Sequence, residues 1–185
     1  MGGSAFSKGP NPLYTPRMAP DVYAAVKKRC HEVLRQLFIC VATPIDGPGK
    51  SDFGDIDILV ALEKRLVFPG IANDHEAYQN NRDALGAVQF RLASEQAIMI
   101  KNQNSVNLAI PWPPHLLPHP GLPTSPQEPR ERYIQVDVRI CESIHQLEWM
   151  LFKHAHGDIW NLLGSSTSSG AQYLLIRDAL GGGYS

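Results

Sequence analysis

The sequence predicts an α+β fold, in which a mixed β-sheet carries an acidic site and helices pack on one side of the sheet. Two segments, 55–62 and 133–141, alternate apolar with polar or acidic side chains, which is the pattern of half-buried β-strands. A third segment, 21–38, has apolar side chains at the spacing of an amphipathic helix. With 185 residues, of which 43% are hydrophobic and 19% charged, the chain is long enough to bury one core.

The first part of the chain contains several prolines and glycines, and we expect residues 1–20 to form a flexible leader before a domain of residues 21–185. Asp21 directly follows a proline and is the expected N-cap of the first helix. A short buried strand is predicted over 39–42, and a turn-rich loop follows over 43–54.

The middle of the chain is predicted to contain one helix and three more strands. After the first acidic strand, Pro69-Gly70 indicates a turn, and Asn73 or Asp74 is the expected cap of a helix that stops at Gly86. Alternating apolar side chains predict the strands that follow, at 87–92, 97–100 and 106–110.

A proline-rich loop opens the last third of the chain. Eight prolines fall between residues 111 and 129, and such a run cannot join the interior of a sheet. We interpret it as an extended connection, with a polyproline partner site as the alternative. After the strand at 133–141, Ser143 is the expected cap of a helix. The core side of that helix is predicted to carry Ile144, Leu147, Met150 and Leu151. Shorter helices are expected at 158–163 and 170–180.

Two aspartates stand out in the first acidic strand. Asp55 and Asp57 are two residues apart and therefore leave the same face, while Ile56 and Ile58 point to the other face and into a core. Neighbouring carboxylates repel each other unless a cation neutralises them, and oxygen ligands suit Mg²⁺ or Mn²⁺. The alternative is a pair of exposed acids that protect an edge strand from aggregation.

A third aspartate, Asp137, lies on the polar face of the strand at 133–141. If this strand lies beside the first, three carboxylates meet on one patch of the sheet. Such a patch can hold two metal ions of the kind that assist phosphoryl transfer.

The stretch Gly-Lys, three residues, then Gly-Asp-Ile-Asp-Ile-Leu-Val, with a later apolar-Asp-apolar strand, resembles the polymerase-beta-like nucleotidyltransferase superfamily. The resemblance covers the chain from about Asp21 to its end, and it implies that superfamily's fold for the mixed sheet. It also implies that Asp55, Asp57 and Asp137 are the catalytic residues and the ligands of two Mg²⁺ or Mn²⁺ ions. The implied reaction transfers a nucleotidyl group from an NTP substrate to a hydroxyl and releases pyrophosphate.

The triphosphate half of the family's site is only partly matched. Relatives carry a Gly-Ser pair about eleven residues before the first metal-binding aspartate, where this chain has Pro44 and Ile45. A proline has no backbone N–H to donate to phosphate. We therefore expect Lys50, Ser51 and Gly54 to be the nucleotide-binding residues of this loop.

Within the superfamily, the pattern of this chain is closest to the palm of X-family DNA polymerases. The segment 157–161 resembles the one that follows the third aspartate in those polymerases. By that resemblance Asp158 and Asn161 contact the nucleotide, with a plain N-cap as the alternative role for Asp158. The chain stops where a thumb subdomain would be built, so that subdomain is expected to be absent. His154 is interpreted as a histidine at a helix terminus that interacts with the backbone.

Composition bears on partners and location. The net charge of −1 gives no basic excess of the kind that binds nucleic acid non-specifically. No apolar run is long enough to span a bilayer, so no membrane association is expected, and the three cysteines favour an intracellular protein of the cytoplasm or nucleus.

Three functions remain open from the sequence. The first is an active nucleotidyltransferase whose acceptor is a nucleic acid 3′-hydroxyl or the hydroxyl of a small molecule or protein. The second is a catalytically inactive relative that serves as a binding or interaction module. The third is a sugar-nucleotide transferase with an Asp-x-Asp motif and Mn²⁺, which predicts a parallel α/β sheet and no third aspartate on a strand.

Overall fold

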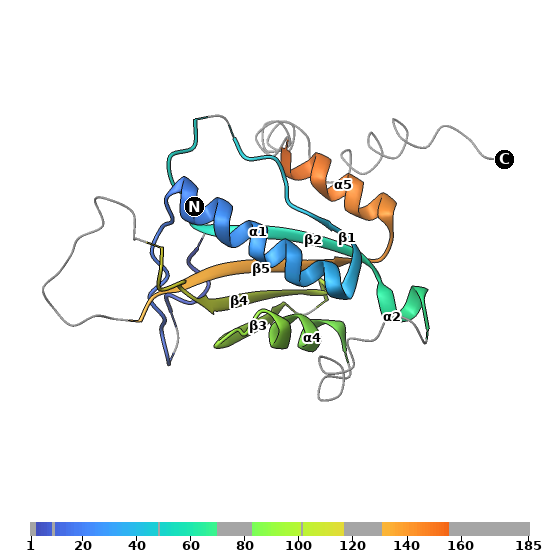
Figure 1. Ribbon diagram of the computed structural model, residues 1–185, viewed down its shortest axis with the longest axis horizontal. Helices are drawn as coiled ribbons and strands as arrows, with labels where there is room; N and C mark the ends of the chain where they lie inside the picture. Colours follow the sequence, from blue (N-terminus) through green and yellow to red (C-terminus); the bar gives the residue numbers. More distant parts are fainter. Residues whose placement is uncertain are drawn as a thin grey trace, which may run out of the picture.

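The computed structural model of the chain describes residues 3–8, 10–47, 49–69, 83–100, 102–116 and 131–155. These residues form an α+β structure around one mixed five-stranded sheet (Figure 1). The helices are α1 (Pro20–Leu37), α2 (Lys64–Val67), α4 (Ala84–Arg91) and α5 (Ile144–Ala155). The strands are β1 (Phe38–Ala42), β2 (Asp55–Glu63), β3 (Gln96–Ile100), β4 (Ser105–Pro111) and β5 (Tyr133–Cys141).

The sheet has the strand order β1-β2-β5-β4-β3. Only the central pair, β2 and β5, is parallel, and the other three pairs are antiparallel. The two strands with the acidic pattern are therefore neighbours, as the three-aspartate hypothesis requires. The mixed sheet differs from the parallel α/β sheet that the sugar-nucleotide transferase hypothesis predicts.

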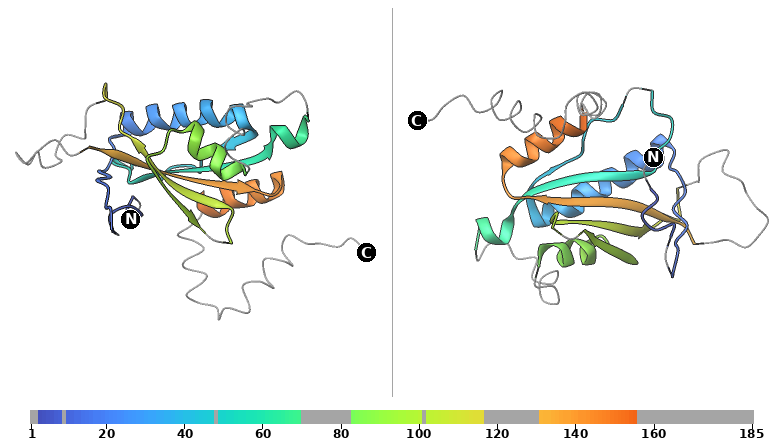
Figure 2. Two further views of the ribbon diagram at one scale, coloured as in Figure 1. Left: turned by 90° about the horizontal axis from the view of Figure 1, so that it is seen from below. Right: turned by 180° about the vertical axis from the view of Figure 1, so that it is seen from behind.

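One face of the sheet packs against α1 and α4. The left panel of Figure 2 shows both helices on this face, and α5 on the opposite one. The core between the sheet and α1 contains the side chains that alternate with the acids, among them Ile56, Ile58 and Val136, which are fully buried. Because successive side chains of a strand point to opposite faces, burying these residues turns the acids to the other face.

Helices do not lie on one side only, so that part of the fold prediction is wrong. Helix α5 packs on the acid-bearing face, where Leu147 joins Leu59, Ala61 and Cys141 in a small second core. Ser143 caps α5 as predicted, because the Gln146 N–H donates to its hydroxyl at 3.1 Å. Ile144 does not join this core, since its side chain is 45% exposed.

The predicted strand at 87–92 is also wrong, because these residues belong largely to α4. Asp83 caps this helix by accepting a hydrogen bond from the Gly86 N–H at 2.6 Å, so Gly86 lies in the first turn rather than at a helix end. Val88 and Leu92 are four residues apart and are both buried in the main core. Over so few residues, the same apolar positions satisfy a strand pattern and a helix pattern.

At the start of α1, the cap is Ala19 and Pro20 occupies the first helical turn, so Asp21 is inside the helix rather than its N-cap. The other predicted strands, at 39–42, 97–100 and 106–110, are confirmed within one residue at each end. The predicted helices at 158–163 and 170–180, and most of the proline-rich loop, lie outside the described residues.

The segment predicted as a flexible leader makes specific contacts with the sheet and the loop before β2. Phe6 is 2% exposed and packs with Ala109 and Tyr133 on the acid-bearing face. Met18 and Phe53 exchange two backbone hydrogen bonds, of 2.7 and 2.9 Å, just ahead of α1 and β2. The start of the chain is thereby held next to the acidic strand.

Within the described part of the chain, no helix is both long and apolar enough to cross a membrane. Cys30 and Cys141 are buried, and all three cysteines are free thiols.

Candidate functional site

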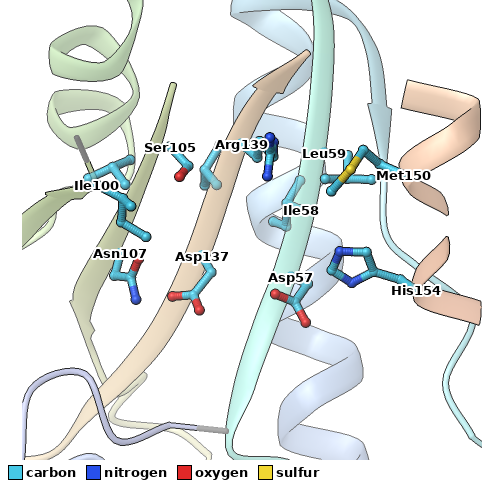
Figure 3. Close-up of a pocket in the computed structure, with 12 residues that line it drawn as sticks. Asp57, Ile58, Leu59, Ile100, Ser105, Asn107, Asp137, Arg139, Met150 and His154 are labelled. Atoms are coloured by element: carbon cyan, nitrogen blue, oxygen red, sulfur yellow. The ribbon is translucent and has the colours of Figure 1, made fainter. Parts of the chain in front are cut away.

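The parallel pairing of β2 with β5 brings the three aspartates together. Asp57 stands directly opposite Asp137 in the register, and Asp55 stands opposite Gln135. Neighbouring strands lie about 4.8 Å apart, so the Asp57 and Asp137 side chains leave the sheet side by side. Figure 3 shows both carboxylates on the same face.

Burial and repulsion by neighbouring carboxylates make ionisation of Asp57 and Asp137 costly. Burial, together with the charges of Asp55 and Asp57, raises the pKa of Asp137 to about 7, although a hydrogen bond from Gln135 acts in the opposite direction. The pKa of Asp57 is also raised, by burial and by the charge of Asp55, although His154 and Lys50 act in the opposite direction. Carboxylates in such a position favour either a proton or a bound cation.

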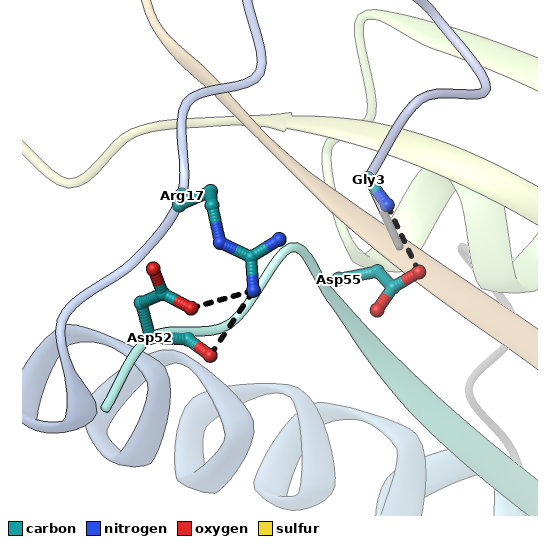
Figure 4. A network of polar contacts seen from close by, with 4 residues as sticks. All are labelled: Gly3, Arg17, Asp52 and Asp55. Atoms are coloured by element: carbon teal, nitrogen blue, oxygen red, sulfur yellow. Dashed lines mark hydrogen bonds and ion pairs between the residues drawn. The ribbon is translucent and has the colours of Figure 1, made fainter. Parts of the chain in front are cut away.

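Two of the three carboxylates, those of Asp137 and Asp55, accept hydrogen bonds from defined donors. The Gln135 amide, which is 3% exposed, donates from Nε2 to both carboxylate oxygens of Asp137 at 3.0 Å. The Gly3 N–H donates to Oδ2 of Asp55 at 3.0 Å (Figure 4). The same view shows Arg17, which pairs with Asp52 at 2.6 Å beside the start of β2.

A polar pocket of about 220 Å³ lies between the loop after β1 and the start of β2. Asp55, Asp57 and Lys50 line it, together with Tyr23 and Asp46. The Tyr23 hydroxyl donates to Asp46 at 2.9 Å, and Lys27 pairs with the same carboxylate at 3.3 Å. We call this the loop-side pocket.

Lys50 is held at this pocket by an aromatic pair. Its ammonium lies 4.6 Å from the centre of the Phe53 ring, and Phe53 stacks on Tyr23 with ring centres 3.8 Å apart. Of the other nucleotide-binding predictions for this loop, Ser51 is exposed and does not line the pocket, and Gly54 is covered by Gly3.

A second pocket, of about 160 Å³, lies beyond Asp57 and Asp137 over β5 and β4. Figure 3 shows Asn107 of β4 beside Asp137, to which it is the register partner. Arg139, two residues along β5, also lines this space. We call it the strand-side pocket, and it meets the loop-side pocket at Asp57.

His154 lines both pockets, which the sequence interpretation of this residue missed. It lies in the last turn of α5, and its ring is directed toward Asp57 in Figure 3. The placement depends on α5 packing on the acid-bearing face, and no local sequence signal predicts that choice. Asn107 was missed for a similar reason, since its place beside Asp137 depends on the pairing of β4 with β5. Asp158 and Asn161 lie outside the described residues.

The donor chemistry of the site fits a hard divalent cation. Asp55, Asp57 and Asp137 offer only oxygen as ligand atoms, and burial, with a smaller contribution from neighbouring carboxylates, raises the pKa values of Asp57 and Asp137. As the side chains lie, no three His, Cys, Asp or Glu residues among those described surround one point closely enough to form a complete metal site. The suitability of the site for a divalent cation therefore depends on Asp57 and Asp137, which face each other in the register, with Asp55 beside them.

No protein-family model matches the chain, and a search of curated proteins finds no significant match.

Proposed function

We propose that the chain is a metal-dependent nucleotidyltransferase that transfers an NMP group from an NTP to a hydroxyl acceptor. The observation that carries this proposal is the register of β2 with β5, which sets Asp57 against Asp137 with Asp55 on the same face. Raised carboxylate pKa values at the junction of two pockets are typical of a catalytic site.

Asp55, Asp57 and Asp137 would hold two Mg²⁺ or Mn²⁺ ions. When bound, such ions neutralise phosphate charge and polarise the oxygens of the group that is transferred. The burial that raises the carboxylate pKa values also lowers the local dielectric, which strengthens every charge interaction inside the site.

The two pockets suit two substrates. The loop-side pocket contains Lys50, whose ammonium can bind the phosphates of the NTP as a point charge. The strand-side pocket brings the acceptor hydroxyl to Asp137, with the Asn107 amide as a further hydrogen-bonding group. Asp57 lies between the two pockets, where the α-phosphate must be.

In the reaction, the acceptor oxygen bonds to the α-phosphorus as the bond from phosphorus to the pyrophosphate oxygen breaks. The hydroxyl proton passes to a carboxylate oxygen of Asp137. Asp137 is suited to this role by its place in the lining of the strand-side pocket, where the acceptor hydroxyl would lie.

The alternative is an inactive relative that serves as a binding module, and one observation favours it. The loop-side pocket contains three carboxylates, those of Asp46, Asp55 and Asp57, against the single lysine Lys50. Lys27 offsets Asp46 through its ion pair, but Pro44 occupies the place of a phosphate-binding residue in the family that the sequence resembles.

The test measures Mn²⁺-dependent binding of a labelled NTP to the wild type, Asp57→Asn and Asp137→Asn. Asn keeps the shape of Asp and removes the charge. The control is Asp83→Asn, because Asp83 caps α4 away from the site and Asn is an equally good cap.

We expect Mn²⁺-dependent binding in the wild type and the control, and its loss in both site variants. A folded wild type that binds no NTP in the presence of Mn²⁺ contradicts the enzyme and leaves the binding module. Binding that persists in both site variants contradicts the assigned site.

A further inference from the structure

The first described residues of the chain contact two side chains at the candidate site. Residues 3–8, which we call the N-terminal segment, lie on the acid-bearing face, with Phe6 buried against Ala109 and Tyr133. The Leu13 N–H donates to the Phe6 carbonyl at 3.0 Å, and the Thr15 hydroxyl donates to the Gly3 carbonyl at 2.9 Å. The segment is thus anchored by an apolar side chain and by two hydrogen bonds from the following residues.

Two backbone N–H groups of this segment reach side chains of the site. Gly3 donates to Asp55 and Ala5 donates to Oε1 of Gln135, both at 3.0 Å. Asp55 and Gln135 are register partners on neighbouring strands. Backbone donors two residues apart therefore hold two side chains that lie next to each other at the entrance to the acidic cluster.

The contact from Ala5 determines which end of the Gln135 amide faces Asp137. An amide has an accepting oxygen and a donating NH₂ group, and its orientation follows from the partners available. Because Oε1 accepts from Ala5, Nε2 is turned toward Asp137 and donates to both of its oxygens. Without the Ala5 donor, the amide loses the hydrogen bond at its oxygen end and is held less firmly against Asp137.

The contact from Gly3 requires a glycine. The φ angle of Gly3 is +83°, and a Cβ atom at this position would lie 2.2 Å from the carbonyl oxygen of Gly54. The segment consequently lies directly on the residue that precedes Asp55. This close approach brings the Gly3 N–H within reach of the Asp55 carboxylate.

We propose that the N-terminal segment positions the carboxylates of the site, with Gln135 and the backbone N–H of Ala5 orienting Asp137 and that of Gly3 orienting Asp55. Gln135 is the positioning residue, because it touches Asp137 and is held by the segment. The inference rests on the proposed function, since it describes how the same carboxylates are prepared for a cation. It goes beyond that function by making residues ahead of α1 part of the site.

The expected loss of metal affinity is estimated from other metal sites in which a second residue holds a ligand in place. Groups that hold metal-binding side chains in place typically change metal affinity by about 10- to 100-fold when they are removed. We expect a loss of this size in Mn²⁺ affinity, without unfolding, when the chain from Ala5 through Gln135 to Asp137 is interrupted.

Two variants interrupt it at different points. Gln135→Met keeps the length of the side chain and removes both polar ends, and Ala5→Pro removes the donating N–H. The matched controls are Gln146→Met, which alters a glutamine that bonds only near the start of α5, and Ala5→Gly, which keeps the N–H. Mn²⁺ affinity is measured by calorimetry, and folding by thermal unfolding.

A second measurement does not depend on a metal. In protein labelled with ¹⁵N at glutamine side chains, the Gln135 NH₂ signals report the orientation and hydrogen bonding of the amide. Ala5→Pro is expected to shift these signals and to speed their exchange with solvent, whereas Ala5→Gly leaves them in place.

The outcomes separate the two proposals. Weaker Mn²⁺ binding in Gln135→Met and Ala5→Pro, with both controls like the wild type, supports positioning by the segment. A wild type that binds Mn²⁺ together with variants that bind equally well overturns this inference and leaves the proposed function intact. A wild type that binds no Mn²⁺ overturns the proposed function, and the Gln135 signals then decide positioning: no response to Ala5→Pro overturns it.

Discussion

Asp137→Asn is expected to make the metal-free protein more stable at high pH while it removes the proposed activity. The folded protein holds the pKa of Asp137 at about 7, because burial and the charges of Asp55 and Asp57 outweigh the hydrogen bond from Gln135. In an unfolded chain the pKa of aspartate is about 3.9. Between these two values the folded state binds more protons than the unfolded state, so the free energy of unfolding falls as the pH rises.

The magnitude follows from that difference. One pKa unit corresponds to about 1.4 kcal/mol, so Asp137 lowers the free energy of unfolding by roughly 2–3 kcal/mol between pH 5 and pH 8. Asparagine has the same shape and does not ionise. The stability of Asp137→Asn relative to the wild type is therefore expected to increase by about this amount from pH 5 to pH 8.

The free energies of unfolding of the variant and the wild type are measured by urea unfolding with excess chelator, at pH 5 and at pH 8. Subtracting the wild-type value from the variant value at each pH cancels the titration of all groups that the two proteins share. Asp83→Asn is the control and is expected to show no change with pH relative to the wild type. A stability difference between Asp137→Asn and the wild type that is the same at both pH values would refute the reasoning about repulsion and burial. Adding Mg²⁺ to about 100 times its dissociation constant should then stabilise the wild type by about 2.7 kcal/mol and the variant by much less.

Three further predictions concern binding, the core and a helix cap. Lys50→Ala should weaken NTP binding by about 10- to 100-fold, because a hydrogen bond to a charged group contributes about 1.5–3 kcal/mol. The control Lys28→Ala, on the exposed face of α1, should leave NTP binding unchanged. An equal loss of binding in both variants would contradict a role for Lys50. Ile58→Ala should lower the free energy of unfolding by about 2–5 kcal/mol in urea titrations, because Ile58 is fully buried. Leu66→Ala, at a side chain that is 71% exposed, should change it by less than about 0.5 kcal/mol, and a similar cost at both positions would contradict the described core. Ser143→Ala should cost about 1 kcal/mol through the lost cap of α5, whereas Ser143→Asp should restore it; a failure of Asp to restore stability would argue against the cap.

The strands of the site were predictable because apolar and polar side chains alternate around each of the aspartates. In β5 apolar and polar side chains alternate along most of the strand, and in β2 they alternate from Asp55 to Ile58, so the faces of Asp57 and Asp137 follow from the sequence. Helix α4 was not predictable in the same way. It has only eight residues, and its apolar positions fit either period until Asp83 is seen to cap it.

The amino-acid sequence alone was enough to predict an α+β fold and to place three aspartates on the polar faces of two strands. Local alternation decides which way a side chain points, and that information is present in every few residues. Three features required the folded chain. The strands β2 and β5 are parallel neighbours with Asp57 opposite Asp137, α5 brings His154 to the acid-bearing face, and Gly3 and Ala5 donate hydrogen bonds to Asp55 and Gln135. Such contacts join residues as far apart as 130 positions, and they depend on the packing of the whole sheet rather than on any local pattern.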